Sequence, residues 1–82
     1  MQLVYFAWLK ERMGRPAETL PLPPGVATVA ELIAWLRARD ERGERALGSG
    51  VVRAAVNGEF AQPGDTLADT DEVALFPPVT GG

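Results

Sequence analysis

The group best able to do covalent chemistry in this chain of 82 residues is its C-terminal carboxylate. The chain has no cysteine and no histidine, which excludes Cys–His and Ser–His nucleophile pairs, disulfides and Cys/His zinc sites. Its sole lysine, Lys10, is not preceded by the glycines of a phosphate-binding loop. The main-chain carboxylate of Gly82 is the obvious group that remains.

The last six residues form a narrow segment that could carry this carboxylate into a partner. Pro77 and Pro78 cannot donate to a β-ladder, and each holds the residue before it in an extended conformation. The next two residues are β-branched, which also favours extended backbone, and the terminal glycines let another chain approach closely. Six extended residues reach about 20 Å. We therefore predict a domain over residues 1–76 and an extended, flexible tail over residues 77–82.

The residues predicted to insert into a partner are Pro77, Pro78, Val79, Thr80 and Gly81, and the reactive group is at Gly82.

The first part of the chain predicts two strands. The apolar run over residues 2–9 is typical of a strand, and its two apolar faces indicate a central strand that is covered on both sides. Residues 9–14 indicate one helical turn that ends at Gly14. Residues 17–22 indicate an edge strand, because Pro21 lacks the ladder donor.

The main helix is predicted to begin after Thr28. Thr28 and Glu31 have the spacing of a capping box. An apolar stripe with helical spacing follows, formed by Val29, Leu32, Ile33 and Leu36. Trp35 lies beside this stripe, and we predict that it flanks the core, with an exposed contact as the alternative.

The second half predicts a loop and then three strands joined by turns. Residues 41–50 are polar and glycine-rich and predict a loop, with a short helical turn around residues 45–47. Asn57-Gly58 is the strongest two-residue hairpin signal, and Pro63-Gly64 favours a type II turn. The last strand is predicted over residues 72–77.

The last strand alternates, with Val73 and Leu75 on one side and Ala74 and Phe76 on the other. Phe76 suits the core and a partner contact equally well, since both favour aromatic residues. The first and last strands are strongly apolar and are expected to be neighbours at the centre of the sheet. Together the elements predict an α+β fold, a mixed sheet with one main helix packed on one face.

Charge and composition limit the partners. The net charge is −3 and the pI is about 4.8, which disfavours nucleic acid and suits basic protein surfaces. The longest apolar run, residues 3–9, is too short to span a bilayer, so we expect no membrane partner and a cytoplasmic protein. The acidic run over residues 65–72 lacks the glycine and glutamate of a calcium-binding loop and is interpreted as capped turns.

Several segments together carry a resemblance to a known family. They are the apolar first strand with Phe6 and Ala7, RMG at 12–14, the capped helix from Thr28, AAVN at 54–57, LADTDEV at 67–73 and above all FPPVTGG at 76–82. Over its whole length the chain resembles the MoaD-type sulfur carriers, the small subunits of molybdopterin synthase in the ubiquitin-like β-grasp superfamily. Thr70 departs from the glycine that relatives often have there.

This resemblance implies a β-grasp fold and a covalent role for the C-terminus. An activating enzyme similar to the ubiquitin E1 enzymes would join Gly82 to AMP, using ATP and magnesium, while the chain itself would bind no cofactor or metal. A persulfide donor would then replace AMP and leave a thiocarboxylate. The tail would insert into the large subunit of the synthase, in a heterotetramer, and pass sulfur to a cyclic pterin phosphate precursor of the molybdenum cofactor. Apolar residues around Phe76 and Val79 are expected to anchor this contact.

Two alternatives stay open, a sulfur carrier of another pathway and a protein of a different class. A sulfur carrier for thiamin or cysteine synthesis would share the Gly-Gly terminus but usually lacks the preceding Phe-Pro-Pro. In the different class, a ubiquitin-like modifier would form isopeptide bonds with lysines, and a plain binding module would tolerate the loss of Gly82.

Overall fold

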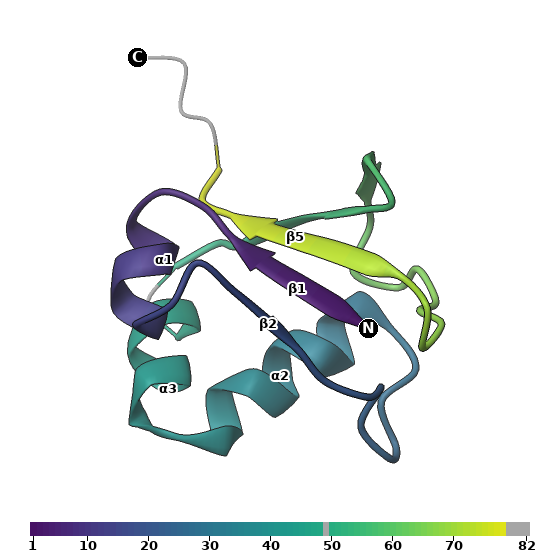
Figure 1. The fold of residues 1–82 in the computed structure, drawn as a ribbon, viewed down its shortest axis with the longest axis horizontal. Coiled ribbons are helices and arrows are strands. Elements are labelled where there is room, and N and C mark those ends of the chain that lie inside the picture. The colour runs from purple at the N-terminus through teal and green to yellow at the C-terminus, as the bar shows by residue number, and fades with distance from the viewer. Residues whose placement is uncertain (49, 79–82) are drawn as a thin grey trace.

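The computed structural model describes residues 1–48 and 50–78. The elements in chain order are β1 (Gln2–Tyr5), α1 (Trp8–Met13), β2 (Ala17–Thr19), α2 (Val29–Arg39), α3 (Glu41–Leu47), β3 (Arg53–Val56), β4 (Glu59–Ala61) and β5 (Glu72–Phe76). The strands of these described residues form a mixed sheet in the order β2-β1-β5-β3-β4, with β1 and β5 parallel at its centre. Figure 1 shows the helices on the same side of the sheet. The α+β prediction, with the first and last strands adjacent, is confirmed.

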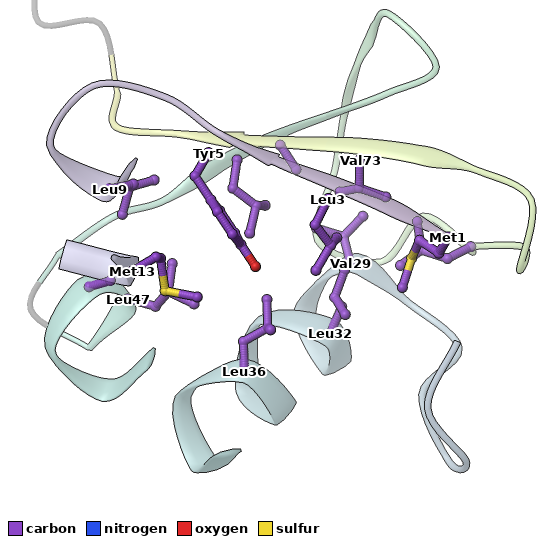
Figure 2. Packing of buried hydrophobic residues seen from close by; sticks show 14 of the residues in the cluster. Met1, Leu3, Tyr5, Leu9, Met13, Val29, Leu32, Leu36, Leu47 and Val73 are labelled. Atoms are coloured by element: carbon purple, nitrogen blue, oxygen red, sulfur yellow. The ribbon is translucent and has the colours of Figure 1, made fainter. Parts of the chain in front are cut away.

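The core lies between the sheet and the helices. Figure 2 shows buried side chains of the strands pointing toward α2. The residues with no exposed surface are Leu3, Leu9, Leu32, Leu36, Val73 and Leu75. Trp35 is half-buried and packs against this cluster, so the prediction that it flanks the core is confirmed.

The first strand is shorter than predicted, and one of its faces is open. β1 ends at Tyr5, because Ala7 has a φ of 56° and lies in a turn that is closed by the Leu9 N–H donating to the Phe6 carbonyl at 3.2 Å. α1 then starts at Trp8 and carries Leu9 into the core, which explains why the apolar run resembled one long strand. In residues 1–48 and 50–78 the helices cover one face of the sheet and leave the other open (Figure 1), so the prediction that β1 is covered on both sides is wrong.

The segment predicted as a loop after the main helix is the helix α3. The Asp40 carboxylate caps it by accepting a hydrogen bond from the Gly43 N–H at 2.8 Å. A glycine is required at position 43, because a Cβ there would lie 1.8 Å from the carbonyl oxygen of Leu36 in α2. The glycine that suggested a loop therefore allows two helices to pack closely, and the prediction of only a short turn around residues 45–47 is wrong.

Turn chemistry is confirmed in two places and corrected in a third. Gly14 ends α1 in the left-handed conformation, with a φ of 80°. Asn57 and Gly58 have φ values of 52° and 84°, as the two-residue hairpin turn between β3 and β4 requires. The turn at Pro63-Gly64 is not type II, because Gly64 lacks the positive φ that this type needs.

The main helix and the edge strand lie where they were predicted. Thr28 Oγ1 accepts a hydrogen bond from the Glu31 N–H at 3.2 Å, and a Glu31 carboxylate oxygen accepts one from the Thr28 N–H at 3.1 Å, which completes the capping box. β2 lies at an edge of the sheet as expected, but it is shorter than the predicted strand over residues 17–22.

A largely buried ion pair joins the edge strand to the end of α2. Arg39 Nη1 and Nη2 donate to the Glu18 carboxylate at 2.8 and 2.9 Å, and the Tyr5 hydroxyl donates to the same carboxylate at 2.6 Å. The hydrogen bonds from Arg39 hold the pKa of Glu18 below its ordinary value. Burial, together with the hydrogen bond to Glu18, raises the pKa of Tyr5. One carboxylate thus ties together β1, β2 and α2.

The substitution Glu18→Gln is expected to lower the free energy of unfolding by about 1–3 kcal/mol at pH 7, because it removes the charge of the carboxylate that accepts two hydrogen bonds from Arg39. The lowered folded-state pKa of Glu18 means that its stabilising effect is present above the unfolded-state value of about 4.3 and is lost as the pH falls through the folded-state value. Urea unfolding near pH 7 and near pH 3 should therefore give a difference between wild type and variant that shrinks at low pH. An equally large difference at both pH values would contradict this charge-based account.

Candidate functional site

The chain leaves the sheet at its centre, where β5 ends beside the end of β1. The Leu75 carbonyl accepts a hydrogen bond from the Phe6 N–H at 3.1 Å, which is the last ladder contact between these segments before Pro77. Because β1 and β5 are parallel, their C-terminal ends meet at the same end of the sheet (Figure 1). The predicted tail therefore starts next to Phe6.

Only the start of the predicted tail belongs to the described residues. Pro77 and Pro78 follow β5 and are half-buried. Outside the described residues lie Val79, Thr80, Gly81 and Gly82. Their insertion into a partner, the reactive role of Gly82 and the division of the chain at residue 77 stay predictions.

Part of the uncovered face of the sheet is apolar, although Arg53, the cross-strand partner of Phe76, lies on the same face. Strand alternation puts Ala74 and Phe76 of β5 on this face, opposite the buried residues of the same strand. Ala74 is paired with Val4 of β1 and with Ala55 of β3, and Ala55 is paired with Phe60 of β4. The rings of Phe60 and Phe76 meet edge to face, 5.9 Å apart. We call this surface the aromatic face; its members are Val4, Phe6, Ala55, Phe60, Ala74 and Phe76.

The aromatic face exposes side chains that water solvates poorly. Phe60 is 85% exposed and Phe6 is 51% exposed. Exposed apolar side chains of this kind are candidates for contact with another protein. Phe76 is half-buried and lies on this face, not in the core, so the geometry favours its interpretation as a partner contact.

Phe60 was not predicted as a site residue from the sequence, and Phe6 was placed within a strand and named for the family resemblance but not as a contact. Two signals could have found them. The two-residue turn at Asn57-Gly58 sets the register that pairs Phe60 with Ala55. Alternation along β1, in which Tyr5 points into the core, puts Phe6 on the opposite face.

Two other kinds of site find no support among the described residues. The acidic run caps turns, since Asp65 accepts a hydrogen bond from the Gln62 N–H at 2.9 Å and Asp71 accepts one from the Ala68 N–H at 2.8 Å. The hydrogen bond from Ala68 also lowers the pKa of Asp71. In the part of the chain that the structure describes, no three His, Cys, Asp or Glu side chains are grouped to hold a metal, and no helix has the length and apolar character needed to cross a bilayer.

Solved structures share this fold. A putative molybdopterin converting factor, subunit 1, from Pyrococcus furiosus matches with a TM-score of 0.77 and 32% sequence identity, over 95% of each chain. SAMP1 from Haloferax volcanii, a small archaeal modifier protein, matches with a TM-score of 0.74 and 34% identity, over 100% of this chain and 98% of the other. The predicted ubiquitin-like β-grasp fold is confirmed.

Sequence comparison then identifies the family. The model of the ThiS family matches residues 3–82, and the chain belongs to this family. The chain is also 37% identical over 82 residues to the molybdopterin synthase sulfur carrier subunit of Escherichia coli K12, covering 100% of this chain and 99% of that protein. The resemblance drawn from the sequence is thus confirmed.

Two adjacent residues of β5 test the assignment of the two faces. Leu75→Ala is expected to lower the free energy of unfolding by about 2–5 kcal/mol, because Leu75 is fully buried. Phe76→Ala is expected to lower it by about 1 kcal/mol, because its ring packs edge to face on the exposed Phe60. Urea unfolding of both variants gives the comparison. Equal losses would put Phe76 in the core and contradict the assignment.

Proposed function

We propose that this chain is the sulfur carrier subunit of a molybdopterin synthase and that Gly82 carries the sulfur as a thiocarboxylate. The observation that carries the proposal is the 37% identity of the chain, over its length, to the Escherichia coli subunit. The sequence adds a Gly-Gly terminus after Pro77 and Pro78. The structure adds exposed aromatic side chains on the open face of the sheet. The chain is then no enzyme on its own. It is the sulfur-donating part of a sulfurtransferase complex.

Activation has to precede sulfur transfer, because charge and resonance protect a carboxylate from nucleophiles. An adenylyltransferase similar to the ubiquitin E1 enzymes joins the Gly82 carboxylate to AMP, using ATP and magnesium and releasing pyrophosphate. The terminal sulfur of a persulfide attacks the acyl carbon and AMP leaves. A thiol then cleaves the sulfur–sulfur bond, which leaves the thiocarboxylate on Gly82. The protein acts as a group carrier whose reactive atom is its own terminus.

This chain contributes the sulfur and its position, and the large subunit contributes the remaining chemistry. The chain has no cysteine, so no internal thiol competes for the carried sulfur. Holding the sulfur in a tunnel next to a cyclic pterin phosphate makes the attack effectively unimolecular. The large subunit supplies the acid–base groups and the cations that bind the phosphate. The chain itself holds no cofactor and works in the cytoplasm.

The aromatic face is the proposed contact with the large subunit in a heterotetramer of two small and two large subunits. Phe6 lies beside the point where the chain leaves the sheet, so docking of this face directs the tail into the partner. Aromatic residues, phenylalanine included, are enriched at protein–protein interfaces. Phe60 and Phe76 form an aromatic pair on this face.

A second candidate function, protein modification, is favoured by the likeness to SAMP1 at 34% identity. A modifier would use the same activated Gly82 but would transfer its acyl carbon to a lysine amine, giving an isopeptide bond. The two functions are distinguished by their products, a thiocarboxylate on the free chain or an amide to another protein. The Phe-Pro-Pro segment ahead of Gly-Gly favours the sulfur carrier.

Deletion of Gly82 is expected to reduce sulfur transfer to the pterin precursor below detection while leaving the fold intact. The measurement combines the chain, its activating enzyme, ATP, magnesium, a sulfide source and the large subunit, and follows conversion of the precursor. Circular dichroism of the truncated chain gives the control for folding. Normal sulfur transfer by the truncated chain would contradict the proposal.

The double substitution of Phe60 and Phe76 by serine is expected to weaken binding of the large subunit about 10- to 100-fold, because it removes two clustered aromatic contacts. Isothermal titration calorimetry measures this change. Val51→Ser is the matched control, because Val51 is also apolar and 65% exposed but lies outside the aromatic face. Equal weakening by both variants, or by neither, would rule out the aromatic face as the docking surface.

A further inference from the structure

The turn between β1 and α1 contains a strained residue. Ala7 has a φ of 56° and a ψ of −138°, and the Leu9 N–H closes the turn on the Phe6 carbonyl at 3.2 Å. These angles are those of the first central position of a type II′ turn, where glycine is the usual residue. A Cβ makes this conformation costly for an L-amino acid.

The side chain of Ala7 offers no compensation of its own, because Ala7 is exposed. The backbone before Ala7 is held by a hydrogen bond, and the helix after it is held by burial of Leu9. Phe6 donates its N–H to the Leu75 carbonyl at 3.1 Å, and Leu9 is fully buried. The Trp8 ring lies under the guanidinium of Arg12, 4.4 Å from ring centroid to Cζ. Ala7 therefore connects the end of the β1–β5 ladder, at the Phe6 backbone, to the first turn of α1.

We propose that Ala7 is a positioning residue, whose restricted backbone holds Phe6 in the aromatic face, beside the start of the tail, before a partner binds. Glycine would relieve the strain, but it would also let the turn sample many more conformations. With alanine the ordering of this segment is completed on folding, so it does not weaken the later association. The inference deepens the proposed function and rests on it.

Substitutions at position 7 can separate the effect of backbone strain from the effect of restricted backbone freedom. The observed φ and ψ are close to the mirror image of the polyproline II conformation. A D-alanine residue adopts that mirror conformation without strain and stays as restricted as L-alanine. Glycine also adopts it without strain but is unrestricted. Restriction is therefore the property that separates both alanine chains from the glycine chain.

The experiment compares four chains: wild type, Ala7→Gly, a chemically synthesised chain with D-alanine at position 7, and Ala68→Gly. The last is the matched control, because Ala68 is exposed in the loop before β5, away from the end of β1. Melting temperature and the dissociation constant for the large subunit are measured for each.

The D-alanine chain is expected to melt about 5 °C or more above wild type, because the strain is gone. Its dissociation constant is expected to stay within about two-fold of the wild-type value. Ala7→Gly is expected to bind about 3- to 10-fold more weakly without melting below Ala68→Gly, since the ordering now occurs on binding. Ala68→Gly is expected to bind like wild type.

The inference is overturned if Ala7→Gly binds as tightly as wild type, or if the D-alanine chain binds as weakly as the glycine variant. An unchanged melting temperature of the D-alanine chain also overturns it, because Ala7 would then carry no strain. Failure of the proposed function looks different. In that case wild type itself does not bind the large subunit, and the inference falls with it.

Discussion

β1 and β5 run parallel at the centre of the sheet, with Tyr5 opposite Leu75. Both strands therefore end at the same end of the molecule, and the hydrogen bond from the Phe6 N–H to the Leu75 carbonyl closes their ladder. An antiparallel pair would send the C-terminus out beside the N-terminus, far from Phe6. The parallel pairing brings the start of the tail, Phe6 and the turn at Ala7 together. The proposed docking requires all three at the same end of the sheet.

The two faces of this sheet have different roles, one in stability and the other in the proposed contact with a partner. Side chains that point toward α2, such as Leu3 and Leu75, have no exposed surface and supply the core. Their neighbours one residue along each strand lie on the aromatic face. Since β-strand side chains alternate with period two, one register sets both faces at once. The ion pair of Glu18 with Arg39 fastens the edge of this sheet to the main helix.

Local signals predicted much of the fold, and contacts between distant segments account for the errors. The capping box at Thr28 and the hairpin at Asn57-Gly58 act within a few residues, and both were predicted correctly. The glycine at position 43 suggested a loop, because its close contact with α2 has no local signature. Alanine is no turn residue, so nothing in the sequence announced the break at Ala7. The terminal chemistry, by contrast, could be proposed from the sequence, since the absence of cysteine and histidine left the carboxylate as the reactive group.

The central claim is that Gly82 carries sulfur, and the direct measurement is thiol-specific alkylation of the chain after incubation with its activating enzyme, ATP, magnesium and a sulfide source. Because the chain has no cysteine, an alkyl label on it reports a thiocarboxylate. The label has to be mapped to a peptide, since exchange of sulfur for oxygen has the same nominal mass as oxidation of Met1 or Met13. The account predicts a label on the peptide that ends at Gly82. No label, with an enzyme that is active on another carrier, would contradict it.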